Sequence, residues 1–110
     1  MNNIQRNVVG IAGAAMYFFL SSVYAGDHKV IQKDKTFKPV TMKIKVGDAV
    51  DFVNEDDFFH NVFSLSDTKS FDLGSYPKGQ GRKVIFDKPG VVEVECSIHP
   101  EMQMKIEVTQ

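Results

Sequence analysis

The sequence predicts an all-β protein, a Greek-key two-sheet β-sandwich of about seven to eight strands, after an N-terminal signal peptide. Short runs rich in Val, Ile and Phe alternate with turn residues along most of the chain. Turn signals recur roughly every 8 to 12 residues, which is typical of a sandwich of antiparallel strands. No stretch after the N-terminal segment keeps a helical period of apolar residues.

The N-terminal segment has the pattern of an export signal. Arg6 precedes an apolar run from Val8 to Leu20, and a short segment of small and tolerated residues ends at Ala25. This order predicts a secretory signal peptide, residues 1–25, cleaved after Ala25. The apolar run is short for a membrane span, which needs about 20 residues, and an uncleaved anchor is the alternative. In both cases the remainder, residues 26–110, is one small exported domain.

The charge and length of the chain limit what it can bind and how stable it can be. The chain carries 13 basic and 14 acidic residues, a formal net charge of −1 with neutral histidines. Nucleic-acid binding would require a strongly basic domain, so it is not expected. A domain this small buries a modest share of its surface, and a bound metal would add to its stability.

The strands are expected in the following order. Residues 30–31 mark the first strand, and residues 41–46 alternate apolar with polar side chains, as a half-buried strand does. Gly47 and Asp48 form a turn before the strand at 50–53, and the acidic loop 54–57 follows. Residues 64–80 are the least regular part, and Tyr76 is predicted to pack in the core. After the alternating residues 83–86 and the turn 87–90 come two final strands, whose inward positions are Val92, Val94, Cys96, Ile106 and Val108.

The segment from Cys96 to Met102 contains three metal donors. Cys96, His99 and Met102 supply a thiolate, an imidazole and a thioether at intervals of three residues. With a second imidazole they would form the ligand set of a blue-copper site. A structural role is the alternative, because a lone cysteine is often a buried apolar residue and methionine fills gaps in cores. Cys96 is the only cysteine, so in an exported protein it cannot form an internal disulfide and needs another explanation.

Two separated blocks of sequence resemble the cupredoxins, particularly the amicyanin and plastocyanin branch of small type 1 copper proteins. The first block is Val46-Gly47-Asp48-Ala49-Val50-Asp51-Phe52-Val53-Asn54, followed by Asp56 and by His60-Asn61-Val62. The second is Phe86-Asp87-Lys88-Pro89-Gly90, which leads to Cys96, His99 and a methionine. Two blocks in the right order are more specific than either one alone.

The resemblance implies one copper ion per domain, which cycles between Cu(I) and Cu(II). Its metal ligands would be His60, Cys96, His99 and an axial methionine, for which Met102 and Met104 both lie near enough. Met102 precedes the alternating strand that starts at Lys105 by the interval that the family's ligand uses. Met104 shares the inward parity of the strand's core residues, so Met102 is predicted to be the ligand.

The resemblance also implies roles around the ligands. Asn61 is expected to hydrogen-bond to Ser97, next to Cys96. The exposed edge of His99 would be the electron port, within an apolar ring formed by Phe58, Phe59 and Pro100. The acidic residues Glu55, Asp56 and Asp57 are predicted either to form a rim that steers a basic partner or to be ordinary solvated surface.

The sequence as a whole indicates an electron carrier and not an enzyme. We expect an exported, periplasmic monomer that exchanges single electrons with transient donor and acceptor redox proteins, binds no nucleic acid, and meets the membrane only if residues 1–25 are retained. The alternative is a copper chaperone or store with the same fold. After cleavage, His28 together with the new amino terminus could bind a second Cu(II) or Ni(II) ion.

Overall fold

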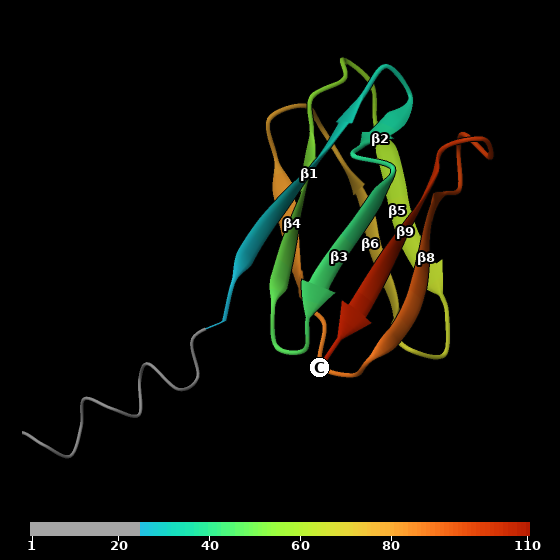
Figure 1. Ribbon diagram of the computed structural model, residues 1–110. Helices are drawn as coiled ribbons and strands as arrows, with labels where there is room; N and C mark the ends of the chain where they lie inside the picture. Colours follow the sequence, from blue (N-terminus) through green and yellow to red (C-terminus); the bar gives the residue numbers. More distant parts are fainter. Residues whose placement is uncertain (1–24) are drawn as a thin grey trace, which may run out of the picture.

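The computed structural model describes residues 25–110, and the predicted signal peptide therefore lies, except for Ala25, outside the described residues. Over this range the chain forms nine strands and no helix. One sheet has the strand order β2-β1-β4-β7 and the other the order β3-β9-β8-β5-β6. The predicted two-sheet sandwich is confirmed, and Figure 1 shows the two sheets facing each other.

The strands of the first sheet are β1 (Asp27–Lys33), β2 (Thr36–Lys38), β4 (Ala49–Asn54) and β7 (Gly81–Ile85). The strands of the second sheet are β3 (Thr41–Lys45), β5 (His60–Leu65), β6 (Ser70–Tyr76), β8 (Gly90–Cys96) and β9 (Gln103–Thr109). The residues predicted to be least regular include β6, a full strand of seven residues.

Pairing direction is where the structure differs from the expected antiparallel sandwich. β1 pairs with β4 and β3 pairs with β9 in parallel, so both sheets are mixed. The chain leaves the first sheet after β2, adds β3 to the second sheet, and returns as β4, which supplies the crossover that a parallel pair requires. The alternation of apolar and polar side chains shows which face of a strand is buried, but it carries no information about the direction of pairing. The sequence pattern therefore could not distinguish parallel from antiparallel pairs.

The core lies between the sheets and follows the predicted alternation. In β9 every second residue is buried, and the same period runs through β4 and β8. The largest fully buried apolar side chains are Tyr76, Phe37, Phe52, Phe86, Met102 and Ile106. Tyr76 packs in the core as predicted, donates its hydroxyl proton to the Phe52 carbonyl at 2.8 Å, and accepts a bond from Gln32 Nε2 at 3.0 Å. Burial raises the pKa of Tyr76 to about 12.

Asp48 fastens the start of β1 to the turn between β3 and β4. Its carboxylate accepts the Gly26 and Lys45 backbone N–H groups at 2.8 and 3.0 Å, and lies 2.8 Å from His28 Nε2. The hydrogen bond from His28 is the main cause that lowers the pKa of Asp48 below 3.8, with help from the two N–H groups and against the opposing effect of burial.

We predict that Asp48→Asn reduces stability most at neutral pH. Because the folded-state pKa of Asp48 lies below its unfolded value, its stabilising contribution is present above that unfolded value of 3.8 and is lost as the pH falls through the folded pKa. In urea titrations, the gap between the wild-type and variant midpoints should therefore shrink in acid. Asp87→Asn, which changes an exposed aspartate, is the control. A gap that stays constant with pH would contradict the assignment.

Candidate metal centre

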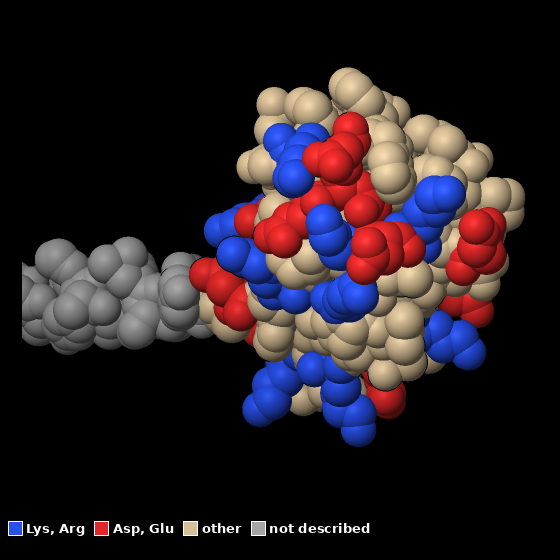
Figure 2. Space-filling model, turned by 90° about the horizontal axis from the view of Figure 1, so that it is seen from above, with Lys and Arg blue, Asp and Glu red and all other residues tan. Residues whose placement is uncertain are grey.

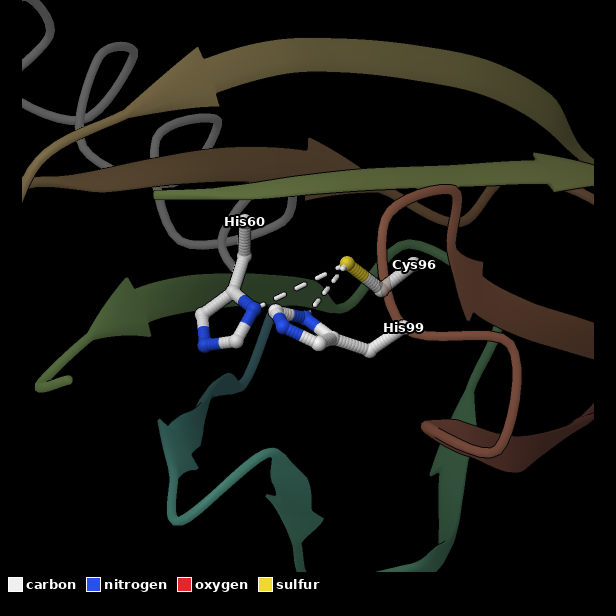
Figure 3. Close-up of side chains that lie close together, drawn as sticks. All are labelled: His60, Cys96 and His99. Atoms are coloured by element: carbon white, nitrogen blue, oxygen red, sulfur yellow. Dashed lines mark hydrogen bonds between the residues drawn. The ribbon is translucent and has the colours of Figure 1, made fainter. Parts of the chain in front are cut away.

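Three of the predicted ligands come together at one end of the sandwich. His60 is the first residue of β5, Cys96 is the last residue of β8, and His99 lies in the loop between β8 and β9. One ligand atom from each lies within 4.8 Å of the other two. The side chains of His60 and Cys96 are buried, whereas His99 is half-buried, and Figure 3 shows both imidazole rings turned toward the Cys96 sulfur.

The spacing of these atoms suits a metal ion bound between them. Cys96 Sγ lies 3.6 Å from His60 Nδ1 and 3.8 Å from His99 Nδ1. Bonds of about 2.0 Å to nitrogen and about 2.3 Å to sulfur, meeting at roughly 120°, hold the two donor atoms about 3.7 Å apart. One thiolate and two imidazoles are also the donors of a trigonal copper site. The donor set and its spacing therefore fit copper.

Strand pairing explains how residues far apart in the sequence meet here. β5 and β8 are antiparallel neighbours, with Val62 opposite Cys96. His60 precedes Val62 by two residues and so lies on the same inward face of β5. The Ser97 N–H donates to the Asn61 carbonyl at 3.1 Å and continues the pairing past the end of β8. The sheet thus sets the distance between the first histidine and the cysteine.

The loop between β8 and β9 is closed by its own backbone. The Met102 N–H donates to the His99 carbonyl at 2.9 Å, and the Cys96 N–H donates to the Met102 carbonyl at 3.2 Å. Met102 therefore stands across from Cys96, and its side chain is buried. Met104 is also buried but stands across from Val94, one side-chain repeat farther along β8.

The contact expected between Asn61 and Ser97 is present. Ser97 Oγ donates to Asn61 Oδ1 at 2.7 Å, and Asn61 Nδ2 donates in turn to Asp72 Oδ1 at 3.1 Å. This side-chain bond and the backbone bond between the same two residues join the ligand loop to β5. Such bonds hold a metal-binding loop in place.

Aromatic side chains border the half-exposed histidine. The Phe58 ring is 5.6 Å from the His99 ring and 5.3 Å from the His60 ring, measured between centroids. Phe58 is 40% exposed and Phe59 is 52% exposed, so neither belongs to the core. Phe58 lies beside His99 as predicted for the apolar ring. Pro100 is exposed next to His99 in the sequence.

The predicted acidic rim is wrong for Asp56. Its side chain is only 5% exposed and its carboxylate lies 2.7 Å from His60 Nε2. Asp57 is exposed but pairs with Lys78 at 2.9 Å. Figure 2, which looks down on this end of the molecule, shows acidic and basic side chains intermixed in place of an acidic ring.

Sequence inspection missed the internal role of Asp56, because three successive acidic residues give no sign of which one points inward. Burial is the largest single influence on its carboxyl and acts to raise the pKa. The hydrogen bonds from His60 and from the Lys35 and Asp34 N–H groups outweigh it, so the pKa of Asp56 lies below its ordinary value. Only Asn54 could have indicated in the sequence that Asp56 points inward. Its Oδ1 accepts the Asp56 N–H at 2.9 Å, and asparagine commonly forms a local turn of this kind.

The N-terminal copper hypothesis is weakened by the contacts of His28. Its Nε2 faces Asp48, and the nitrogen of Gly26 donates to the same carboxylate. Wrapping a metal ion with these groups would also disrupt the pairing of the first residues of β1 with β4.

We predict that Asn61 and Ser97 are energetically coupled. In a double-mutant cycle with Asn61→Ala and Ser97→Ala, the loss of one side-chain hydrogen bond should give a coupling of about 0.5–1.5 kcal/mol in the free energy of unfolding. Denaturant titrations of the metal-free protein measure this directly. Additive effects of the two changes would show that the bond contributes nothing to stability.

A sandwich with a buried thiolate and two imidazoles at one end defines a class, the small copper-binding β-sandwich proteins. Residues 24–110 match the copper-binding proteins of the plastocyanin/azurin family. The methylamine utilization protein MauL of Methylorubrum extorquens is 35% identical over 68 residues, which cover 61% of this chain and 60% of MauL. The chain thus spans less than two thirds of that relative.

Solved structures agree with this match. A reduced amicyanin variant superposes with a TM-score of 0.68 at 26% identity, covering 76% of this chain and 82% of amicyanin. A copper-containing nitrite reductase from Thermus scotoductus superposes with a TM-score of 0.72 at 29% identity, covering 76% of this chain but only 22% of the reductase. The enzyme is therefore similar to this chain over a small part of its length.

The chain belongs to the plastocyanin/azurin family of copper-binding proteins. Its cofactor is copper, which the donor set of His60, Cys96 and His99 fits. Within residues 25–110, no helix has the length and apolar character to cross a membrane.

Proposed function

We propose that this protein is a mononuclear blue-copper electron carrier that passes single electrons between redox proteins. The observation that carries the proposal is the group of His60, Cys96 and His99, whose ligand atoms converge within 4.8 Å. Copper bound there would accept and release one electron. Catalysis on a substrate would instead need an open coordination position on the metal. A fourth ligand from the protein would fill that position, so the proposed site suits electron transfer.

Cys96 as thiolate and the two Nδ1 atoms of His60 and His99 are proposed as the trigonal ligands. Met102 is proposed as the fourth ligand, because it stands across from Cys96 in the position directly before β9. Side chains directly opposite each other have Cβ atoms about 5 Å apart, whereas the diagonal pair of Met104 with Cys96 would lie about 7–8 Å apart. The soft sulfur donors favour Cu(I) and the imidazoles favour Cu(II), so one arrangement serves both states.

The surroundings suit a site that changes little when an electron arrives. Two ligands lie on strands of one sheet, and the loop that supplies the third is held by the backbone bonds of Met102 and by the bond from Ser97 to Asn61. The half-exposed ring of His99, next to exposed Phe58, offers the electron a short path to a docked partner. We therefore expect transient partners to dock on this end.

The proposed location is the periplasm, after removal of residues 1–25, and the protein is proposed to act as a monomer. The amino-terminal pattern described above supports export. The charges near the site do not favour one kind of partner, since exposed Asp57 pairs with Lys78 and basic side chains border the acidic ones.

Copper reconstitution tests the proposal. Adding Cu(II) to the purified protein should give an intense blue, thiolate-dependent absorption and reversible one-electron reduction, and Cys96→Ser should abolish the colour. Ile98→Val, a change at an exposed position of the same loop, is the control that should stay blue. A colourless complex that exchanges its metal readily would instead indicate a copper-handling protein.

The two methionines should respond differently to substitution. Met102→Leu is expected to shift the reduction potential, because the axial ligand tunes it, and to change stability little. Met104→Leu keeps the volume of a core residue and should leave the potential close to the wild-type value. Protein-film voltammetry of both variants measures this, and the opposite pattern would assign the axial position to Met104.

A further inference from the structure

Asp56 is a buried acid whose oxygens all face hydrogen-bond donors. Oδ1 accepts the Asp34 N–H at 2.7 Å, and Oδ2 lies 3.1 Å from the Lys35 nitrogen and 2.7 Å from His60 Nε2. Each oxygen thus accepts one backbone N–H group, and hydrogen bonds of this kind favour the ionised carboxylate. Its flanking residues Glu55 and Asp57 are exposed, which makes Asp56 the one inward-facing acid of this loop.

The turn between β1 and β2 provides the anchor. Asp34 and Lys35 have φ angles of +56° and +58°, the left-handed pair that a two-residue hairpin requires. The strands close with Lys33 opposite Thr36, so the N–H groups of the two turn residues are left for another acceptor. Successive N–H groups of this kind form a concave cradle for an anion. The Asp56 carboxylate occupies that cradle.

The contact with Asp56 orients the ring of His60. A carboxylate that accepts at Nε2 favours the tautomer with its proton on Nε2, and this leaves the Nδ1 lone pair directed toward the site. Nδ1 is the atom that lies 3.6 Å from the Cys96 sulfur. A chain of contacts thus runs from the turn through Asp56 and His60 to the thiolate, and every group in it except the turn is buried.

We propose that Asp56 is a positioning residue for the copper site, held by the N–H groups of the turn between β1 and β2, that fixes His60 with Nδ1 toward the metal and stabilises the oxidised ion. Its effect on the metal rests on the proposed function, whereas its effect on the ring does not. A carboxylate bonded to a ligating histidine increases the electron density on the ring and strengthens binding of the more charged Cu(II). The reduction potential is thereby lowered.

A matched pair of variants separates this role from general electrostatics. Asp56→Asn keeps the size of the side chain but replaces the charged acceptor, and Asp57→Asn removes the same charge from the next residue, which is exposed. Loss of such a partner costs about 10- to 100-fold in metal affinity. If the loss falls on Cu(II), the potential rises by about 59 mV for each tenfold change. The Asp57 variant should shift it far less, since that site is screened by water.

The ring itself is tested without copper. Nitrogen NMR of the metal-free wild-type protein should show a proton on Nε2 of His60 that exchanges slowly with water, as a buried hydrogen bond to Asp56 requires. A ring protonated at Nδ1 alone, or equal shifts of potential in the two aspartate variants, would overturn the proposal. If Asp56→Asn does not fold, the wild-type measurement still decides. If the wild-type protein does not turn blue with copper, the proposed function fails while the NMR result stands by itself.

Discussion

The register among β5, β8 and β9 is the constraint on which the site depends. It sets Val62 opposite Cys96, brings His60 in on the same face, and leaves Met102 across from Cys96 at the mouth of the ligand loop. A shift of one residue would turn each of these side chains to the other face of its strand. The alternating apolar side chains of β8 and β9 resist such a shift, because it would expose the core. The same residues therefore hold the sandwich together and fix the donor distances.

The first sheet supports the site from a different direction. It provides none of the proposed ligands, but its turn between β1 and β2 holds the carboxylate that faces His60. The ligands thus come from the second sheet, and the first sheet supports them. The two sheets must pack together to bring the turn between β1 and β2 close to His60. For a redox centre this arrangement is useful, since a ring fixed from both sides has little freedom to reorganise when the charge on the metal changes.

The surface near His99 divides into an apolar part and a mixed-charge part. Exposed Phe58 next to the half-exposed ring gives an apolar contact area, while in the adjacent acidic loop Asp56 is buried and Asp57 is paired with Lys78. Recognition there would depend more on close apolar contact than on long-range attraction, which salt screens.

The sequence alone determined the two-sheet sandwich, because alternation of apolar side chains marks the inward face of each strand. The resemblance to the cupredoxins added the expectation that His60, Cys96 and His99 approach one another and that Asn61 bonds to Ser97, and the structure contains both contacts. Tertiary structure decided the parallel pairs β1–β4 and β3–β9, the burial of Asp56, and the contact of His28 with Asp48. Each of these joins segments whose relative placement depends on how the two sheets pack. The side chain of Asp56 differs from those of its acidic neighbours only in facing a turn that lies some twenty residues earlier in the chain.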